Sequence, residues 1–272
     1  MQTIVAIGSF DNIKSREVRF LHEASKLGQL TVLLWSDELF EQIEGNKPEF
    51  PQMERKYFIE SVRYVNRVIL INHFPDRDEI PKIDNLSPDI WVISENEDTP
   101  HKHTFCSKNE IQLKLIKDFD LQLIPTDPFD LDSLTSSSTV IVTGSFDWLH
   151  TGHIRFFEET SELGDLFVVV GHDQNLQLLK GAGHPLFPEH ERLYMVQSIR
   201  FVKQALISTG HGWMDAEPEI NLIQPNLYVV NEDGDVPDKR KFCEERNLQY
   251  KVLKRAPKPG LTARQSTDLR GF

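Results

Sequence analysis

One short stretch, Gly144 to His153, constrains the fold of this chain more than any other part of it. Its sequence is Gly-Ser-Phe-Asp-Trp-Leu-His-Thr-Gly-His. An apolar run over 139–143 precedes it, and apolar residues recur at helical spacing over 154–163. The pattern therefore predicts a β-strand, a tight turn and an α-helix in direct succession.

The junction between such a strand and helix suits an anion. The first N–H groups of a helix have no partner within the helix, and the helix dipole places partial positive charge beside them. His150 and His153 are three residues apart, so both lie on one face of the opening turn and can face a bound polyphosphate. Ordinary turn chemistry with a surface histidine would explain one of these features, but not their combination.

The stretch resembles the signature of the nucleotidyltransferase superfamily of cytidylyltransferases and related adenylyltransferases. In that signature a strand is followed by Gly-x-Phe-Asp and then by His-x-Gly-His at the start of a helix. His150 and His153 match its two histidines. The resemblance implies a Rossmann-like α/β fold and a catalytic role for both side chains.

The same pattern occurs earlier in the chain, which indicates an internal duplication. Matching segments lie 136 residues apart, and 137 apart after one extra residue; they are 8–11 with 144–147, 25–28 with 161–164, 61–65 with 198–202, and 105–106 with 242–243. The chain is therefore predicted to contain two copies of one α/β unit. Cys106 and Cys243 fall at equivalent positions, which favours two half-buried thiols over a disulfide or a metal pair.

Each copy is predicted to alternate five strands with helices. The expected strands are 3–7, 30–35, 67–71, 90–94 and 121–124 in the first copy, and 139–143, 166–171, 204–207, 227–231 and 249–253 in the second. A variable loop is expected after the second strand of each copy. Short apolar strands that alternate with helices predict a parallel sheet covered on both faces, with ligand beyond the carboxyl ends of its strands.

A polar segment over 133–138 predicts a linker, which gives domains of 1–134 and 135–272. The resemblance implies that the two repeats pack as an intramolecular pseudo-dimer; whether the chain also forms a homodimer is left open.

The two copies differ where chemistry is expected. Lys14-Ser-Arg-Glu17 stands in the place of His150 to His153, and Glu44 stands in the place of Lys180. The first copy also has no counterpart of the segment 265–270. We therefore predict that the first domain is catalytically inactive, with a structural, dimer-like or regulatory role.

In the second copy the resemblance assigns roles around the histidine pair. The turn Gly144, Ser145 and Phe146 would offer backbone N–H groups to a phosphate. Asp147 would help to hold Mg²⁺ or would fix the turn. Lys180, in the loop after the second strand, would reach the phosphates, unless it is a solvated surface lysine.

Arg192 matches a nucleotide-contacting arginine of the family. Arg55 persists at the same place in the first copy, so a structural salt bridge would explain both.

Further candidates lie toward the C-terminus. Ser266 and Thr267 resemble the closing Ser/Thr motif of the family, where hydroxyls and helix N–H groups form a second anion site. In the family an arginine precedes this motif; its role here falls to Arg255, Lys258 or Arg264, and the sequence leaves the choice open. Candidates for the acceptor or base region are Asp173, Asn231 and Asp233, with acidic loop residues at strand ends as the alternative.

Composition narrows the partners. A formal net charge of -12 and a pI near 5.3 argue against nucleic-acid binding. The chain has no apolar run of the roughly 18 residues that a membrane span needs. We expect a reduced, soluble, cytoplasmic protein that acts on small molecules.

Two anion sites, two histidines and a lysine, without a nucleophile and base pair, suit nucleotidyl transfer with Mg²⁺ as cofactor. The expected reaction joins CTP to a phosphorylated alcohol and releases pyrophosphate, since the chain most resembles the phosphoethanolamine and glycerol 3-phosphate cytidylyltransferases. One alternative is an adenylyltransferase that uses ATP on a sugar phosphate or similar acceptor. A second alternative is a nucleotide-binding regulatory protein.

Overall fold

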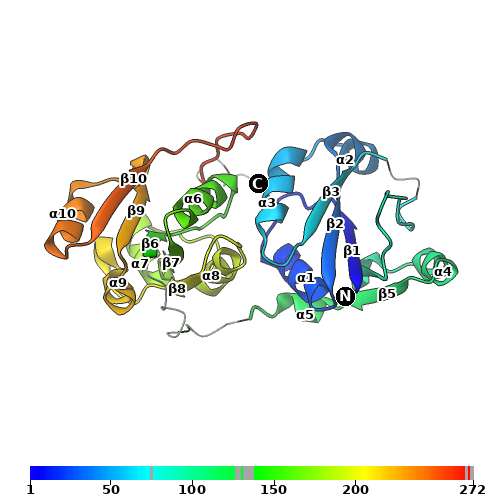
Figure 1. The fold of residues 1–272 in the computed structure, drawn as a ribbon, viewed down its shortest axis with the longest axis horizontal. Helices are drawn as coiled ribbons and strands as arrows, with labels where there is room; N and C mark the ends of the chain where they lie inside the picture. Colours follow the sequence, from blue (N-terminus) through cyan, green and yellow to red (C-terminus); the bar gives the residue numbers. More distant parts are fainter. Residues whose placement is uncertain (74–75, 126–129, 131–137, 267–268, 270–272) are drawn as a thin grey trace. The chain divides into compact units, whose positions relative to one another are not determined.

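The computed structural model describes residues 1–73, 76–125, 130, 138–266 and 269. The chain divides into two compact units, Met1–Ile124 and Pro125–Phe272 (Figure 1). The predicted domain boundary between residues 134 and 135 lies outside the described residues, and the predicted pseudo-dimer stays a prediction.

The first unit is a parallel five-stranded sheet with flanking helices. Its sheet order is β3-β2-β1-β4-β5. Its elements are β1 (Thr3–Gly8), α1 (Ser15–Ser25), β2 (Gln29–Trp35), α2 (Asp37–Glu44), α3 (Gln52–Ser61), β3 (Arg67–Ile71), β4 (Ile90–Ser94), the 3₁₀ turn η1 (Glu95–Glu97), α4 (Pro100–Lys108), β5 (Gln112–Ile116) and α5 (Asp118–Gln122).

The second unit has the same topology. Its sheet order is β10-β9-β6-β7-β8, which is the order of the first sheet followed from the opposite edge. Its elements are β6 (Thr139–Gly144), α6 (Thr151–Ser161), β7 (Asp165–Val170), α7 (Asp173–Lys180), α8 (Glu189–Gln197), β8 (Gln204–Ile207), η3 (Gly212–Met214), α9 (Glu217–Ile223), β9 (Leu227–Asn231), η4 (Glu232–Gly234), α10 (Pro237–Glu245) and β10 (Gln249–Leu253).

These two sheets confirm the predicted fold class, two tandem Rossmann-like parallel units. One predicted strand is wrong: the first unit closes with β5 at 112–116, whereas 118–122, in the region expected to be a strand, forms α5. In β5, partly buried Leu113 and Leu115 alternate with exposed Gln112 and Lys114, as in an edge strand covered on one face. The alternation is short and half polar, so its hydrophobic signal is weak.

In both units a short helix that was not predicted precedes the expected loop after the second strand. Ser36 caps α2 with its side chain, which accepts a hydrogen bond from the backbone of Leu39. His172 caps α7 in the same way through Asn175. An N-cap side chain satisfies a backbone donor that the first helical turn leaves free, so these short helices are stabilised at their starts.

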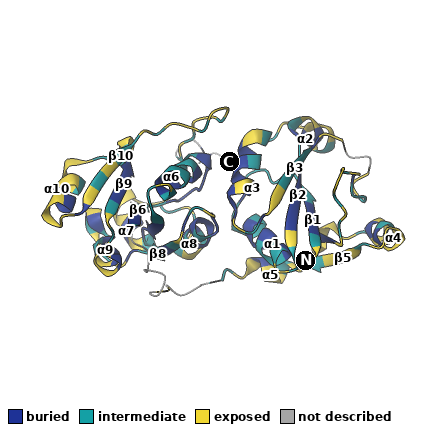
Figure 2. Cartoon of the chain, viewed as in Figure 1, coloured by how far each residue is buried: buried dark blue, intermediate teal, exposed yellow. Residues whose placement is uncertain are grey.

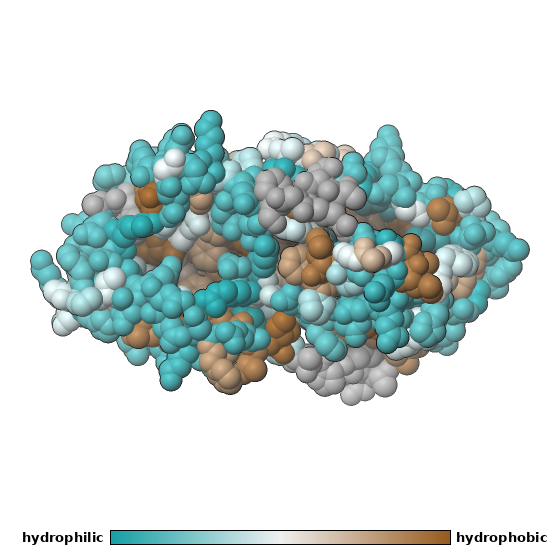
Figure 3. Space-filling model, turned by 180° about the vertical axis from the view of Figure 1, so that it is seen from behind, coloured by the Kyte–Doolittle hydropathy of each residue, from teal (hydrophilic) through white to brown (hydrophobic). Residues whose placement is uncertain are grey.

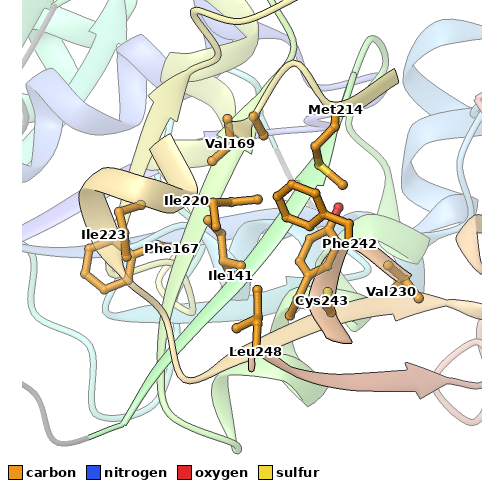
Figure 4. Packing of buried hydrophobic residues seen from close by; sticks show 12 residues of the cluster. Ile141, Phe167, Val169, Met214, Ile220, Ile223, Val230, Phe242, Cys243 and Leu248 are labelled. Atoms are coloured by element: carbon orange, nitrogen blue, oxygen red, sulfur yellow. The ribbon is translucent and has the colours of Figure 1, made fainter. Parts of the chain in front are cut away.

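The most deeply buried residues lie in the central strands of the two sheets, which are dark blue in Figure 2. In the second unit a cluster of buried side chains packs between the sheet and helices α9 and α10 (Figure 4). It includes Phe167, Phe242 and Cys243. Cys243 is 1 % exposed and Cys106 is 2 % exposed, so both free thiols are more deeply buried than predicted.

On the face in Figure 3, hydrophilic residues cover most of the surface and the hydrophobic ones form small separate patches. Among the described residues, no helix is both long enough and apolar enough to span a bilayer.

Candidate active site

The turn after β6 has a geometry that depends on a glycine. Phe146 has a left-handed backbone, with φ of 46°. Its ring folds back over Gly144, where a Cβ atom would lie 2.9 Å from the ring carbon Cζ. The same ring meets His153 edge-on, at 5.3 Å between centroids. Gly144 therefore lets the phenylalanine pack under the start of α6.

The two predicted histidines meet at the first turn of α6. Their rings stack with centroids 4.0 Å apart and planes 28° apart. His150 is the N-cap residue, and its Nδ1 accepts a hydrogen bond of 3.1 Å from the backbone N–H of Gly152. A neutral imidazole whose Nδ1 accepts carries its proton on Nε2. His150 thus presents an N–H donor at Nε2.

That donor is buried, and no described group accepts its hydrogen bond. His150 is 3 % exposed. A buried donor without an acceptor costs free energy, so such groups are rare and mark places that a ligand completes.

The surroundings keep both rings neutral. Burial, together with the smaller effect of the charges of Arg255 and Arg264, lowers the pKa of His150 to about 3. Burial also holds the pKa of His153 well below its ordinary value, with His150, Arg255 and Lys180 adding to the effect. Near neutral pH the pair therefore acts through hydrogen bonding rather than through charge.

Gly152 is a site residue that the sequence reasoning did not single out. A Cβ atom here would lie 2.9 Å from Cε1 and 3.0 Å from Nδ1 of His150, and 3.3 Å from the carbonyl oxygen of Arg264. Only a glycine lets the imidazole and the C-terminal segment approach the helix together. The signal in the sequence was its position between the two histidines.

Lys180 reaches the same turn from the far end of α7. It is the last residue of that helix, and its Nζ donates a 2.8 Å hydrogen bond to Oγ of Ser145. The ammonium group thus lies at the turn that begins the histidine motif. A lysine and two neutral histidines with their N–H groups form a local environment suited to a polyphosphate.

Asp147 holds the turn through backbone hydrogen bonds. Its Oδ1 accepts from the N–H groups of Leu186 at 2.6 Å and Phe187 at 3.2 Å, and the residue is 4 % exposed. These contacts favour the turn-fixing role over magnesium binding.

Arg192 likewise makes its hydrogen bonds within the protein. It is 1 % exposed and donates to the carbonyl oxygens of Phe187, Ser145 and Gly171 at 2.9, 2.6 and 2.8 Å. It also pairs with Asp173 at 2.7 Å. A guanidinium with this many internal acceptors favours the structural role for Arg192, and the ion pair gives the same role to Asp173.

The C-terminal segment places two of its three candidate cations beside the histidines. Arg255 pairs with Asp233 and donates to the carbonyl oxygen of Arg264 at 3.1 Å. Both arginines influence His150, as their effect on its pKa shows. Lys258 instead pairs with Glu158 at 2.7 Å.

A cavity of about 120 Å³ lies beside this segment. Its lining includes Gly152, Asn231, Arg255 and Arg264. The structure therefore brings Asn231 to the site and Asp233 to one of its arginines. Ser266 lies near by, with Oγ 3.4 Å from the carbonyl oxygen of Trp148, whereas Thr267 lies outside the described residues.

Comparison with known proteins finds a matching family model and similar sequences. The family model described as Cytidylyltransferase-like matches residues 141–248. An FAD synthase from Methanocella paludicola is 33 % identical over 118 residues, which cover 42 % of this chain and 81 % of that protein. An FAD synthase from Methanoculleus marisnigri is 35 % identical over 130 residues, covering 47 % of this chain and 83 % of that protein.

A solved structure, the lipopolysaccharide core biosynthesis protein from Thermoplasma volcanium GSS1, shares 26 % identity. It covers 44 % of this chain and 98 % of its own, with a TM-score of 0.37.

Proposed function

The chain belongs to the cytidylyltransferase-like nucleotidyltransferases, and we propose that its second unit transfers an adenylyl group from ATP to the phosphate of a small phosphomonoester. The relatives named FAD synthase support ATP, because FAD contains an adenylyl group. The CTP-dependent reaction expected from the sequence, with a phosphoethanolamine or glycerol 3-phosphate type of acceptor, is the second candidate. The description of the matching family model favours it.

The observation that carries the proposal is the buried N–H donor of His150, stacked on His153 at the start of α6. A donor aimed at a developing anion accelerates a reaction most when it is fixed in a place that excludes water. The Lys180 ammonium at the same turn completes an environment for the phosphates of a nucleotide.

The reaction follows from these groups. An oxygen of the acceptor phosphate, already an anion near neutral pH, attacks the α-phosphorus. A new P–O bond forms, the bond between the α-phosphorus and the bridging oxygen breaks, and pyrophosphate leaves with the electron pair. No general base is required. His150 donates to an α-phosphate oxygen as charge builds there, and Lys180 balances charge on the leaving pyrophosphate.

Magnesium fits this scheme as a partner of the triphosphate. Within the described part of the chain, no three His, Cys, Asp or Glu side chains gather as ligands for a metal ion. The Asp147 carboxylate already accepts two backbone hydrogen bonds. We therefore assign Mg²⁺ to the phosphate oxygens of the bound nucleotide, where it would neutralise charge.

We also propose that the first unit is catalytically inactive. In place of the second histidine it carries Glu17, whose Oε2 accepts a 2.9 Å hydrogen bond from the backbone of Lys14. This carboxylate satisfies the start of α1 from within the chain, where α6 leaves room for a ligand anion. In place of Lys180 the first unit carries Glu44, which pairs with Arg77 at 2.7 Å.

The test is pyrophosphate release with Mg²⁺, crossing ATP and CTP against FMN, sugar phosphates, glycerol 3-phosphate and phosphoethanolamine. We expect turnover with ATP and one acceptor, a product that contains AMP by mass spectrometry, and loss of turnover in His150→Ala/His153→Ala. Turnover with CTP alone would establish the second candidate. Nucleotide binding without turnover on any acceptor would support a regulatory protein instead.

A further inference from the structure

The first unit contains a cavity of about 340 Å³ at the position equivalent to the candidate active site of the second unit. It is lined by the turn after β1, the start of α1, the end of β4 and α5; the lining residues used below are Phe10, Arg16, Glu17, Phe20, Ser94, Asn96, Glu97 and Leu121. Of these elements, α1 and α5 lie side by side in Figure 1. A volume of this size falls within the ~300–1,000 Å³ of small-molecule sites.

Its position corresponds to the nucleotide site of the second unit. By the offsets of the duplication, Arg16, Phe20 and Ser94 match Gly152, Phe156 and Asn231. All three of those residues line the 120 Å³ cavity beside the histidine pair. The inactive unit has thus kept a hollow at this place, and the hollow is the larger of the two.

The cavity disfavours phosphate. Glu17 holds its carboxylate on the backbone N–H of Lys14, in the place where an anion would otherwise bind the helix start. Glu97 adds a second carboxylate, with Oε2 3.3 Å from the backbone nitrogen of Ser94. The one cation in the lining, Arg16, is paired with Asp118 at 2.6 Å. Negative charge therefore dominates the polar side.

The remaining wall suits a flat, partly apolar molecule. Phe10 and Phe20 contribute aromatic rings, and Leu121, which is 4 % exposed, contributes an aliphatic side chain. Other lining groups offer hydrogen-bond acceptors, namely the carboxylates and the amide oxygen of Asn96, whose nitrogen donates to Asp118 at 2.7 Å. A planar base can pack on the rings while its amino groups and ribose hydroxyls donate to these acceptors.

We propose that the first unit binds a nucleoside without phosphate in this cavity. The duplication supplies a pocket at the site where the second unit takes a nucleotide, and the exchange of histidine for Glu17 removes the affinity for the phosphate part. This role goes beyond the transferase reaction, and the argument for it rests on the proposed nucleotide site of the second unit.

The test is calorimetry on the full chain, with the second site saturated by a non-hydrolysable ATP analogue. Adenosine, cytidine, guanosine and uridine are titrated, each beside its 5′-monophosphate. We expect one nucleoside to bind about 100-fold more tightly than its monophosphate, because the phosphate would lie within a few ångströms of two carboxylates. Failure of all four nucleosides to bind would overturn the proposal.

Three variants locate the site. Asn96→Trp places an indole over the cavity from an exposed position and should weaken nucleoside binding by more than about tenfold. Asn96→Ala removes one acceptor without filling the space and should weaken binding by only about threefold. Glu17→Gln keeps the cap with a neutral oxygen and should raise monophosphate affinity by about tenfold. Binding that Asn96→Trp leaves intact would assign the nucleoside elsewhere and overturn the proposal.

Discussion

The turns that follow β1 and β6 are held by the same kind of buried arginine network, but they differ in the residues at the start of the next helix. In the second unit the buried arginine network consists of Arg192 with its carbonyl acceptors and Asp173. In the first unit Arg55, also 1 % exposed, donates to the carbonyl oxygens at the three matching positions and pairs with Asp37 at 2.7 Å. Asp11 and Asp147 accept backbone hydrogen bonds at matching places too.

The likeness ends three residues later in each unit, where the helix begins. Helix α6 begins with a neutral histidine that keeps a buried donor available, and α1 begins with a capping box closed by Glu17. The comparison teaches that the turn and the chemistry are separable. A buried guanidinium that spans a loop, a strand end and a helix start fixes the backbone, and a few side chains then decide whether an anion binds there.

The largest effect should come from removing the buried arginine that both units share. Arg192→Ala and Arg55→Ala should each lower the free energy of unfolding by about 3–5 kcal/mol, because each leaves several buried carbonyls and a carboxylate without their donor. Urea denaturation measures this, with Arg240→Ala at an exposed ion pair as the control, which should leave the free energy of unfolding close to that of wild type. If Arg192→Ala weakened nucleotide binding and left stability unchanged, the structural role would be wrong.

The histidine pair should separate the units most sharply. His150→Ala or His153→Ala should lower kcat by about 10²–10³, the range for removing a donor to a developing anion. Lys14→Ala, at the position that matches His150, should leave kcat unchanged. Steady-state pyrophosphate release checks all three variants. Equal losses from Lys14→Ala would show that the first unit contributes to the reaction.

Gly152→Ala tests positioning alone. The new Cβ would push the His150 ring or the Arg264 carbonyl, and a displacement near 1 Å can cost about 100-fold in kcat. Alanine favours a helix over glycine by about 0.5–1 kcal/mol, so the loss of rate should occur without loss of stability. A variant with normal kcat and a normal melting temperature would show that the close contact at Gly152 is dispensable.

Lys180→Ala should have a smaller effect because the ammonium is exposed to solvent. We expect kcat/KM for the nucleotide to fall about tenfold. The dependence of kcat/KM on salt concentration should also become weaker.

The matched change Glu44→Lys introduces the same charge in the first unit. It should yield no activity in a chain that also carries His150→Ala/His153→Ala, since the first unit would still lack both histidines.

The smallest effect concerns pH. His150 has a pKa of about 3 in the folded chain against about 6.5 when unfolded. The unfolded state therefore binds protons first, and stability falls as pH drops below about 6.5. Between pH 7.5 and pH 6.0 this linkage should cost about 0.8 kcal/mol. Urea denaturation of wild type and His150→Ala at both pH values measures it. A pH slope unaltered by the substitution would show that His150 is not buried and neutral.

The sequence by itself determined the two parallel units, nearly all of their strands, and the meeting of His150 with His153. These features depend on local patterns: apolar runs of strand length, and a spacing of three residues that places two side chains on one helical face. The alternation of β5 is weak, so its strand was predicted in the wrong place. The short capped helices α2 and α7 also carried little local signal and were not predicted.

Only the tertiary structure decided what the charged residues do. Arg192, Asp147 and Asp173 matched family positions, yet their partners are carbonyls, N–H groups and a guanidinium from segments far along the chain. The contact that makes Gly152 necessary likewise involves Arg264, distant in sequence. The energy of a charged or closely packed group depends on which neighbours the fold brings to it, and no local pattern contains that information.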